Sequence, residues 1–296
     1  MVCLDFNPSG RFALVRGCLL IIFLVAVVGC FPATAPSPRT PDSASPAAIA
    51  SPSPAAPIGP NGEKLVEQSA ETRFQLDLHV ADDALTRIMP SGWSSNVATS
   101  GTARDVNLQV VFIDRLTING PTGVPVGTNG NRLVQFVAPV KNDAGATAML
   151  VIGGLTEDLA DAPGPFGNYL PAGTHKVSRS TSDTGGSSII DAQDWVFEAT
   201  SGEHVELHVT YDRGTPAREP ISDTRLYSAR NPGFYQLQRQ AQMPDILRNV
   251  ATAPPDRVHE FSFTCVGGSF ASVCDGTQKV LSWDNILWND RQIFQP

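Results

Sequence analysis

The chain has 296 residues and a formal net charge of -8 at pH 7. This acidic balance argues against a nucleic-acid partner, because proteins that bind the phosphate backbone need a basic face. Nine of the 24 prolines fall between residues 31 and 60, in a stretch that is otherwise mostly Ala, Ser and Thr. Such a stretch buries too little apolar surface to fold, so we expect residues 30–64 to be a disordered tether. Residues 65–296 are long enough for a single domain with a sizeable core.

The N-terminus has the pattern of an export signal. Arg11 and Arg16 precede an apolar core at residues 18–28, which is too short for a typical membrane-spanning helix. Residues 27–30 read Val-Val-Gly-Cys and resemble a bacterial lipobox, in which the cysteine becomes the acylated first residue. We therefore expect residues 1–29 to be a lipoprotein signal peptide and Cys30 to anchor the exported protein to a membrane of the bacterial cell envelope. A plain signal peptide and an uncleaved anchor are the alternatives.

The five cysteines then divide into two groups. Cys3 and Cys18 leave with the signal, and Cys30 carries the lipid. Cys265 and Cys274 remain in the folded part, and an exported domain with two cysteines at this spacing favours one disulfide, closed by a turn at residues 266–268. Two buried free thiols are the alternative, and no neighbouring residues complete a zinc site.

Most of the folded part shows the alternation or the β-branched composition of strands. Strands are predicted at residues 74–80, 107–114, 133–140, 148–152, 195–200, 204–211, 233–243 and 257–266, with tight turns at residues 142–145 and 201–202. Short helices are predicted at residues 82–89, with an Asp cap, and at residues 244–250, where Pro244 takes the first position. Residues 178–188 are expected to be one mobile loop. Many strands and few helices predict a barrel or a sandwich.

One strand carries a weak metal-site candidate. His204, Glu206 and His208 alternate, so their side chains share a face, and two imidazoles with a carboxylate could hold a divalent metal. The solvent-facing side of a hairpin is the competing and preferred interpretation, and we expect no cofactor. No Gly-x-Ser-x-Gly motif and no phosphate-binding glycine motif occurs.

The segment at residues 153–171 is rich in Gly, Pro and aromatic residues and lies between predicted strands. Segments of this kind can form rigid loops that line a pocket, and Glu157, Asn168 and Tyr169 would be its polar groups. An ordinary surface connection is the alternative.

The order of these features resembles the acetoacetate decarboxylase family over about residues 70–294. A strand at residues 74–79 leads into a short helix that ends at Pro90, and a second strand covers residues 106–114. Residues 151–157 resemble the strand that enters the family's Gly-Arg-Glu-type loop, and a hairpin at residues 195–211 follows. Residues 258–262, 267–268, 270–273 and 285–288 resemble the family's last strands and turns. The resemblance implies a mainly β fold with few short helices, a closed cone-like β-barrel with an internal, largely apolar pocket.

The catalytic residues of that family are missing. The family activates a lysine next to a second lysine to form a Schiff base, and this pair follows a Tyr-Pro element. Here the corresponding residues 168–171 read Asn-Tyr-Leu-Pro, no lysine lies between Lys141 and Lys176, and adjacent lysines occur nowhere. We therefore expect no Schiff-base decarboxylation, although Lys176 stands beside His175.

Three hypotheses for function follow. The first is a lipid-anchored protein that binds a small, partly apolar molecule or an organic acid. Its candidate ligand-binding residues are Glu157, Asn168, Tyr169, His175 and Lys176. The second is an extracytoplasmic lyase or hydrolase that uses carboxylate and histidine groups, for instance Glu157 with His175. The third is a non-catalytic envelope interaction module. Fold alone does not choose among them.

Overall fold

The computed structural model describes residues 57–163, 166–183, 185, 188–248 and 257–296. The predicted signal peptide, Cys30 and most of the predicted tether lie outside these residues. Residues 57–63 of the expected tether are described and turn into the first strand, where the Gly59 amide donates to the Glu63 carbonyl at 2.8 Å and the Glu63 side chain is buried. None of the described helices has the length and hydrophobicity of a membrane span.

The described residues form a mainly β structure, in agreement with the predicted fold class. Strands β1 to β6 are Lys64–His79, Trp93–Ser95, Leu108–Asn119, Asn131–Asn142, Thr147–Thr156 and Tyr169–Asp183. Strands β7 to β12 are Ile189–Ala199, His204–Asp212, Ser222–Ser228, Tyr235–Arg248, Val258–Val266 and Lys279–Gln295. The helices are α1 (Asp82–Ile88) and the 3-10 turn η1 (Gly268–Phe270).

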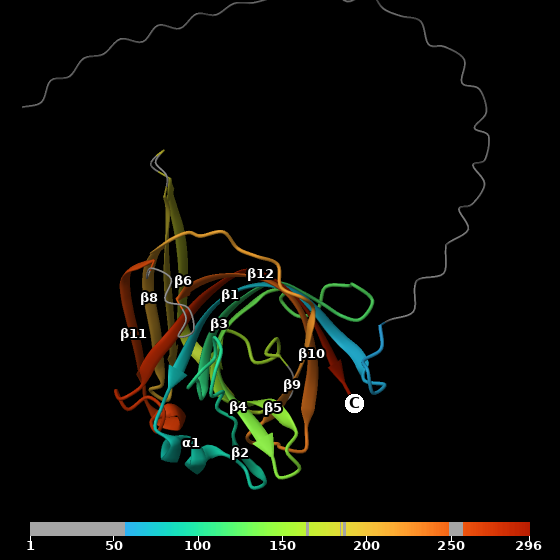
Figure 1. Ribbon diagram of the computed structural model, residues 1–296. Coiled ribbons are helices and arrows are strands. Elements are labelled where there is room, and N and C mark those ends of the chain that lie inside the picture. Colours follow the sequence, from blue (N-terminus) through green and yellow to red (C-terminus); the bar gives the residue numbers. More distant parts are fainter. Residues whose placement is uncertain (1–56, 164–165, 184, 186–187, 249–256) are drawn as a thin grey trace, which may run out of the picture. The chain divides into compact units, whose positions relative to one another are not determined.

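The strand pairings close a ring. The twelve-stranded sheet runs β11-β8-β7-β6-β5-β9-β10-β12-β1-β3-β4-β2, and β4 also pairs with β5. The pairing path β5-β9-β10-β12-β1-β3-β4 therefore returns to β5, and Figure 1 shows β1, β3 and β12 side by side in this wall. Two parallel contacts, β5 with β9 and β5 with β6, connect otherwise antiparallel strands. Every other strand neighbour of the ring is antiparallel, so alternate residues of each ring strand point into it.

The main apolar core lies between the ring and the remaining strands. Strands β6, β7, β8 and β11 continue the sheet beyond β5 (Figure 1). Phe74, Phe112 and Phe136, from β1, β3 and β4, join Trp195 and Leu207, from β7 and β8, in one buried cluster. One face of these ring strands thus packs outward in the apolar core, and the opposite face is left for the interior.

Two sequence predictions about this region are wrong. Residues 244–250 were expected to be helical, but β10 continues to Arg248 and Pro244 sits at a register shift opposite β12. A bulge tolerates proline inside a strand because no ladder hydrogen bond is required there. Residues 178–188 were expected to be one loop, but β6 continues to Asp183 and pairs there with the start of β7 at Ile189.

Helix α1 forms where predicted, without the expected cap. Its N-cap residue is Ala81, which makes no side-chain cap hydrogen bond, and Asp82 and Asp83 lie in its first turn. Carboxylates there still favour the helix through its dipole.

The predicted disulfide is present between Cys265 and Cys274. The segment between them does not make a tight hairpin turn. It contains η1, and the Cys274 amide donates to the Phe270 carbonyl at 2.9 Å. Cys265 lies at the end of β11, so the disulfide ties η1 to the edge of the sheet.

Candidate functional site

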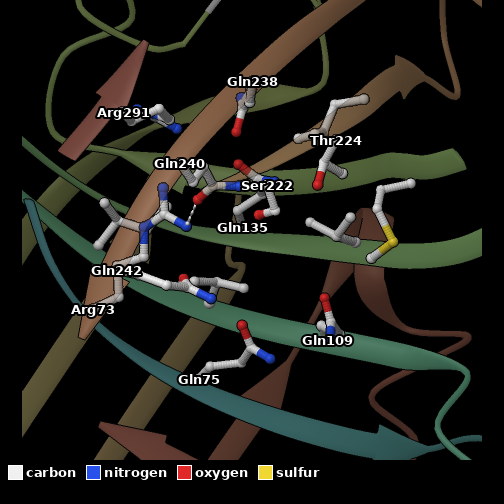
Figure 2. A pocket seen from close by; sticks show the side chains of 15 residues that line it. Arg73, Gln75, Gln109, Gln135, Ser222, Thr224, Gln238, Gln240, Gln242 and Arg291 are labelled. Atoms are coloured by element: carbon white, nitrogen blue, oxygen red, sulfur yellow. Dashed lines mark hydrogen bonds between the residues drawn. The ribbon is translucent and has the colours of Figure 1, made fainter. Parts of the chain in front are cut away.

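A cavity of about 270 Å³ lies inside the ring of strands. All seven ring strands contribute side chains to it (Figure 2). The lining consists of Arg73, Gln75, Gln109, Val111, Ile113, Gln135, Val137, Met149, Ser222, Thr224, Leu226, Gln238, Gln240, Gln242 and Arg291. The resemblance implied a largely apolar pocket, and this expectation is wrong, because most of these side chains are polar.

The lining is divided between two kinds of side chain. The apolar members come from neighbouring strands β3, β4, β5 and β9, which supply Val111, Val137, Met149 and Leu226 among others. The arginines and most of the glutamines come from β1, β10 and β12. An occupant with one apolar side and one polar end would match both halves.

Exposure distinguishes the two ends of the cavity. Gln135, Gln238 and Arg291 are at most 5 % exposed, whereas Gln75 and Gln242 are half-buried. We call the Arg73–Arg291 end the floor and the Gln75–Gln242 end the mouth.

The floor is built on one fully buried carboxylate, Glu71. Its Oε2 accepts from Arg73 Nε and Nη2 at 2.9 and 2.7 Å, and its Oε1 accepts from the Ser69 hydroxyl at 2.8 Å. Arg291 pairs with the same Oε1, and Arg115 Nε lies 3.4 Å from it. Burial alone would raise the pKa of Glu71, but Arg291, Arg73 and Arg115 outweigh it and lower the pKa to about 2.

The floor brings three buried guanidinium groups together with buried carboxylates. Arg73, Arg115 and Arg291 face two carboxylates, those of Glu71 and Glu67. Burial also raises the pKa of Glu67, against the opposing effect of Arg115 and Arg291. The buried carboxylate of Asp161 also acts on Glu67, and buried cations of this kind require anionic or hydrogen-bonding partners.

One guanidinium group also keeps a donor without a partner in the described part of the chain. Arg73 Nη1 donates to Gln240 Oε1 at 2.8 Å, as Figure 2 shows, while Arg291 Nη1 has no acceptor among the described residues. An arginine carries five N–H donors in a planar fork that suits a carboxylate. The floor is therefore arranged to accept an anionic group.

Behind the floor, a second apolar cluster adjoins the cavity. Phe166 and Tyr169 pack there with Ile113 and Leu226, which line the cavity. The Tyr169 hydroxyl donates to Gln135 Oε1 at 2.7 Å, and burial raises the pKa of this phenol. Tyr169 thereby orients the amide of a lining residue.

Gly154 makes this packing possible. A Cβ atom at this position would lie 2.6 Å from the Tyr169 ring and 2.5 Å from the Val134 carbonyl oxygen. The glycine pair at residues 153–154 thus serves close packing of aromatic rings.

Comparison with solved structures agrees with the family resemblance. The chain is similar to acetoacetate decarboxylase-like proteins. The enduracididine biosynthesis enzyme MppR is 12 % identical, with a TM-score of 0.47 over 86 % of this chain and 96 % of that one. An acetoacetate decarboxylase-like enzyme from Sphingomonas wittichii RW1 is 10 % identical, with a TM-score of 0.47 over 81 % and 97 %. Acetoacetate decarboxylase from Legionella pneumophila is 13 % identical, with a TM-score of 0.45 over 83 % and 92 %. No family model and no curated protein matches the chain.

The lysines lie away from the cavity. The whole chain contains four, Lys64, Lys141, Lys176 and Lys279, and all four side chains are exposed. None of them belongs to the lining.

The candidate ligand-binding residues chosen from the sequence do not line the cavity. His175 Nε2 lies 3.4 Å from Glu157 Oε1, and both side chains are partly exposed. Asn168 is turned toward backbone, with its amide 2.5 Å from the Val151 carbonyl. Lys176 is exposed. Only Tyr169 reaches the site, through Gln135.

The histidine strand does not gather a metal set. His204 lies between Glu198 at 3.2 Å and Glu206 at 3.3 Å, whereas His208 Nδ1 lies 2.6 Å from Asp194 Oδ1. The hydrogen bond with Asp194 raises the pKa of His208. Among the described residues, no group of three or more His, Cys, Asp or Glu could hold a metal ion.

Sequence reasoning missed the residues that do line the cavity. The signal was present as alternation: Gln236, Gln238, Gln240 and Gln242 occur at every second position of β10. Alternation identifies residues on one face of a strand but does not show whether that face meets solvent or a closed interior. Four alternate glutamines on one face, without the charged residues typical of a solvent-exposed face, could have indicated that this face lines an interior.

Proposed function

We propose that the barrel cavity binds a small, partly apolar carboxylic acid through hydrogen bonds and charge, without a covalent bond to the protein. The observation that carries the proposal is the floor, where the guanidinium groups of Arg73 and Arg291 line the cavity and Arg291 Nη1 has no acceptor among the described residues. The apolar strands opposite would contact the hydrocarbon part of the acid. Because every lysine is exposed, binding of this kind does not lead to a Schiff base.

Calorimetric titration of the full-length protein with hexanoate tests this proposal. We expect saturable binding that Met149→Trp abolishes, because an indole at this lining position would fill the cavity without removing a charge. Leu116→Trp is the matched control, since Leu116 is 46 % exposed and outside the lining. Absence of saturable binding, or equal binding by Met149→Trp, would contradict the proposal.

Covalent trapping tests the absence of Schiff-base chemistry. After incubation with acetoacetate and borohydride, the intact mass of the protein should be unchanged. A mass increase located at Lys176 by peptide mapping would overturn this part of the proposal, because Lys176 is the lysine nearest in sequence to the position of the family's pair.

We also infer that the binding domain is exported and held at a membrane by acylated Cys30. The support is the sequence: an apolar segment, Val-Val-Gly-Cys at residues 27–30, and a proline-rich spacer. Cys30→Ser should abolish incorporation of labelled palmitate and release the protein from membranes. Cys3→Ser is the control, since Cys3 would leave with the signal peptide. Unchanged labelling of Cys30→Ser would refute the anchor.

A further inference from the structure

A smaller chamber adjoins the mouth of the barrel cavity. Its volume is about 120 Å³, and Gln75 and Gln242 line both spaces. Beyond these two amides its polar lining includes Asp77, Asp284 and Glu219. We call this space the acidic chamber. It differs from the floor in the sign of its charge.

Two buried polar atoms of the acidic chamber have no partner. Ser282 is 2 % exposed, and its hydroxyl makes no hydrogen bond within the described part of the chain. Asp284 Oδ1 is likewise buried without a partner there. An unsatisfied buried polar group typically costs about 1–3 kcal/mol, so such groups are uncommon without a reason. Both residues line the chamber, so its wall contains buried polar groups without a partner among the described residues.

The chamber also lacks a cation. Asp77 accepts hydrogen bonds from Gln75 and Gln109 Nε2 at 2.9 and 3.0 Å, and Glu219 accepts from Gln242 Nε2 at 2.6 Å. These donors are neutral amides. No ion pair of the described residues involves Asp77, Asp284 or Glu219, whereas Glu71 on β1 and Asp245 on β10 are paired with arginine.

The pKa of Asp284 reflects the absence of a cationic side chain from the lining of the acidic chamber. Burial, with smaller contributions from Asp77, Glu219 and Asp245 in the same direction, raises its pKa to about 8. Burial also raises the pKa of Asp77. A cation placed among these groups would favour their ionised forms and would be held by them.

The spacing of the two charged regions limits the ligand. Arg73, Gln75 and Asp77 are alternate residues of β1 and point into the same interior. Four residues of strand span about 13 Å between Cα atoms, and the long arginine side chain shortens the gap between the charged groups. A chain of about six carbons is of the right order to bridge it.

We propose that the ligand carries a protonated amine as well as a carboxylate, with the carboxylate at the floor and the amine in the acidic chamber among Asp77, Asp284 and Glu219. The ligand class is then an ω-amino carboxylate or a related zwitterion. This inference rests on the proposed function, because it uses the same cavity and the same arginines.

Calorimetry of the full-length protein at pH 7 with 6-aminohexanoate and with hexanoate tests the inference. The wild type should bind 6-aminohexanoate at least about 10-fold more tightly, a difference of about 1.4 kcal/mol. Asp284→Asn should bring the ratio of the two affinities close to one. Glu219→Gln, at a half-buried loop position, is a second variant in case Asp284→Asn does not fold, and it should lower the same ratio. Asp223→Asn is the control, since Asp223 pairs with Arg239 outside both spaces and should leave the ratio unchanged.

The outcomes separate the two proposals. Equal affinity of the wild type for the two compounds would overturn the amine site and leave the carboxylate site standing. Failure of both compounds to bind would overturn the carboxylate site and the inference with it. An unchanged ratio in both Asp284→Asn and Glu219→Gln would place the amine elsewhere and refute the acidic chamber.

Discussion

Glu71→Gln removes the one carboxylate that three arginines share at the cavity floor. The side chain of Glu71 is completely buried, and the change keeps its shape while deleting its charge. The pKa of Glu71 is lowered from 4.5 to about 2. A shift of that size corresponds to about 3 kcal/mol of stability at pH 7, close to the loss usually seen when a buried ion pair is broken. We therefore expect the free energy of unfolding to fall by about 3 kcal/mol.

Urea unfolding followed by tryptophan fluorescence measures this loss. A carboxylate with a depressed pKa stabilises the fold above its unfolded-state pKa, and this contribution decreases as the pH falls toward its folded-state pKa. The difference between wild type and Glu71→Gln should therefore narrow by about 1 kcal/mol between pH 7 and pH 4. Glu157→Gln is the control: Glu157 is partly exposed, and its loss should change stability by no more than about 0.5 kcal/mol. A loss below about 1 kcal/mol for Glu71→Gln, or a gap independent of pH, would refute this account of the floor.

Three further perturbations test other parts of the structure. Asp284→Asn should stabilise the protein by about 1–3 kcal/mol at pH 9 and by less at pH 6, because an aspartate with a raised folded-state pKa destabilises the fold once the pH is high enough to remove its proton. Chemical unfolding at the two pH values measures the stabilisation, and an equal stabilisation at both would contradict the prediction. Replacing both Cys265 and Cys274 by serine should cost about 2.5 kcal/mol from loop closure relative to the oxidised wild type. The reduced wild type is the control and should match the variant. Gly154→Ala should lower the melting temperature by several degrees, because the added methyl group would meet the Val134 carbonyl and the Tyr169 ring. Gly145→Ala is the control for backbone strain alone, since Gly145 is a turn residue with positive φ and open space around it. An equal fall in melting temperature for the two variants would contradict the packing argument.

The sequence predicted the strands well where alternation and β-branched residues agree. The predicted strand at residues 204–211 is β8 almost residue for residue, and the turn at Ser201 and Gly202 joins it to β7 as expected. The boundaries of β1 and β10 were too short. Both strands belong to the ring, and their ends pair with β12. The local sequence does not reveal this long-range pairing.

The helix expected after Pro244 shows why local signals fail in such strands. Proline at a first position followed by Asp-Ile-Leu-Arg fits a helix start as well as a strand with a bulge. Tertiary contacts decide the matter, because Asp245 pairs with Arg257, and Leu247 is buried in the main core.

The floor of the cavity could not be predicted from sequence spacing. Glu71, Arg115 and Arg291 come from three strands, with more than 200 residues between the first and the last. Their meeting depends on the closure of the ring. The sequence shows that the chain has no adjacent lysines, a feature that needs no geometry, but it did not identify the arginines that line the cavity.

A crystal structure of the protein with 6-aminohexanoate tests the central claim most directly. The account predicts the ligand inside the ring of strands, with a carboxylate oxygen about 3 Å from a guanidinium nitrogen of Arg73 or Arg291. The amine would then lie toward Asp284. A ligand bound outside the barrel, or one inside it with its carboxylate turned away from both arginines, would contradict the account.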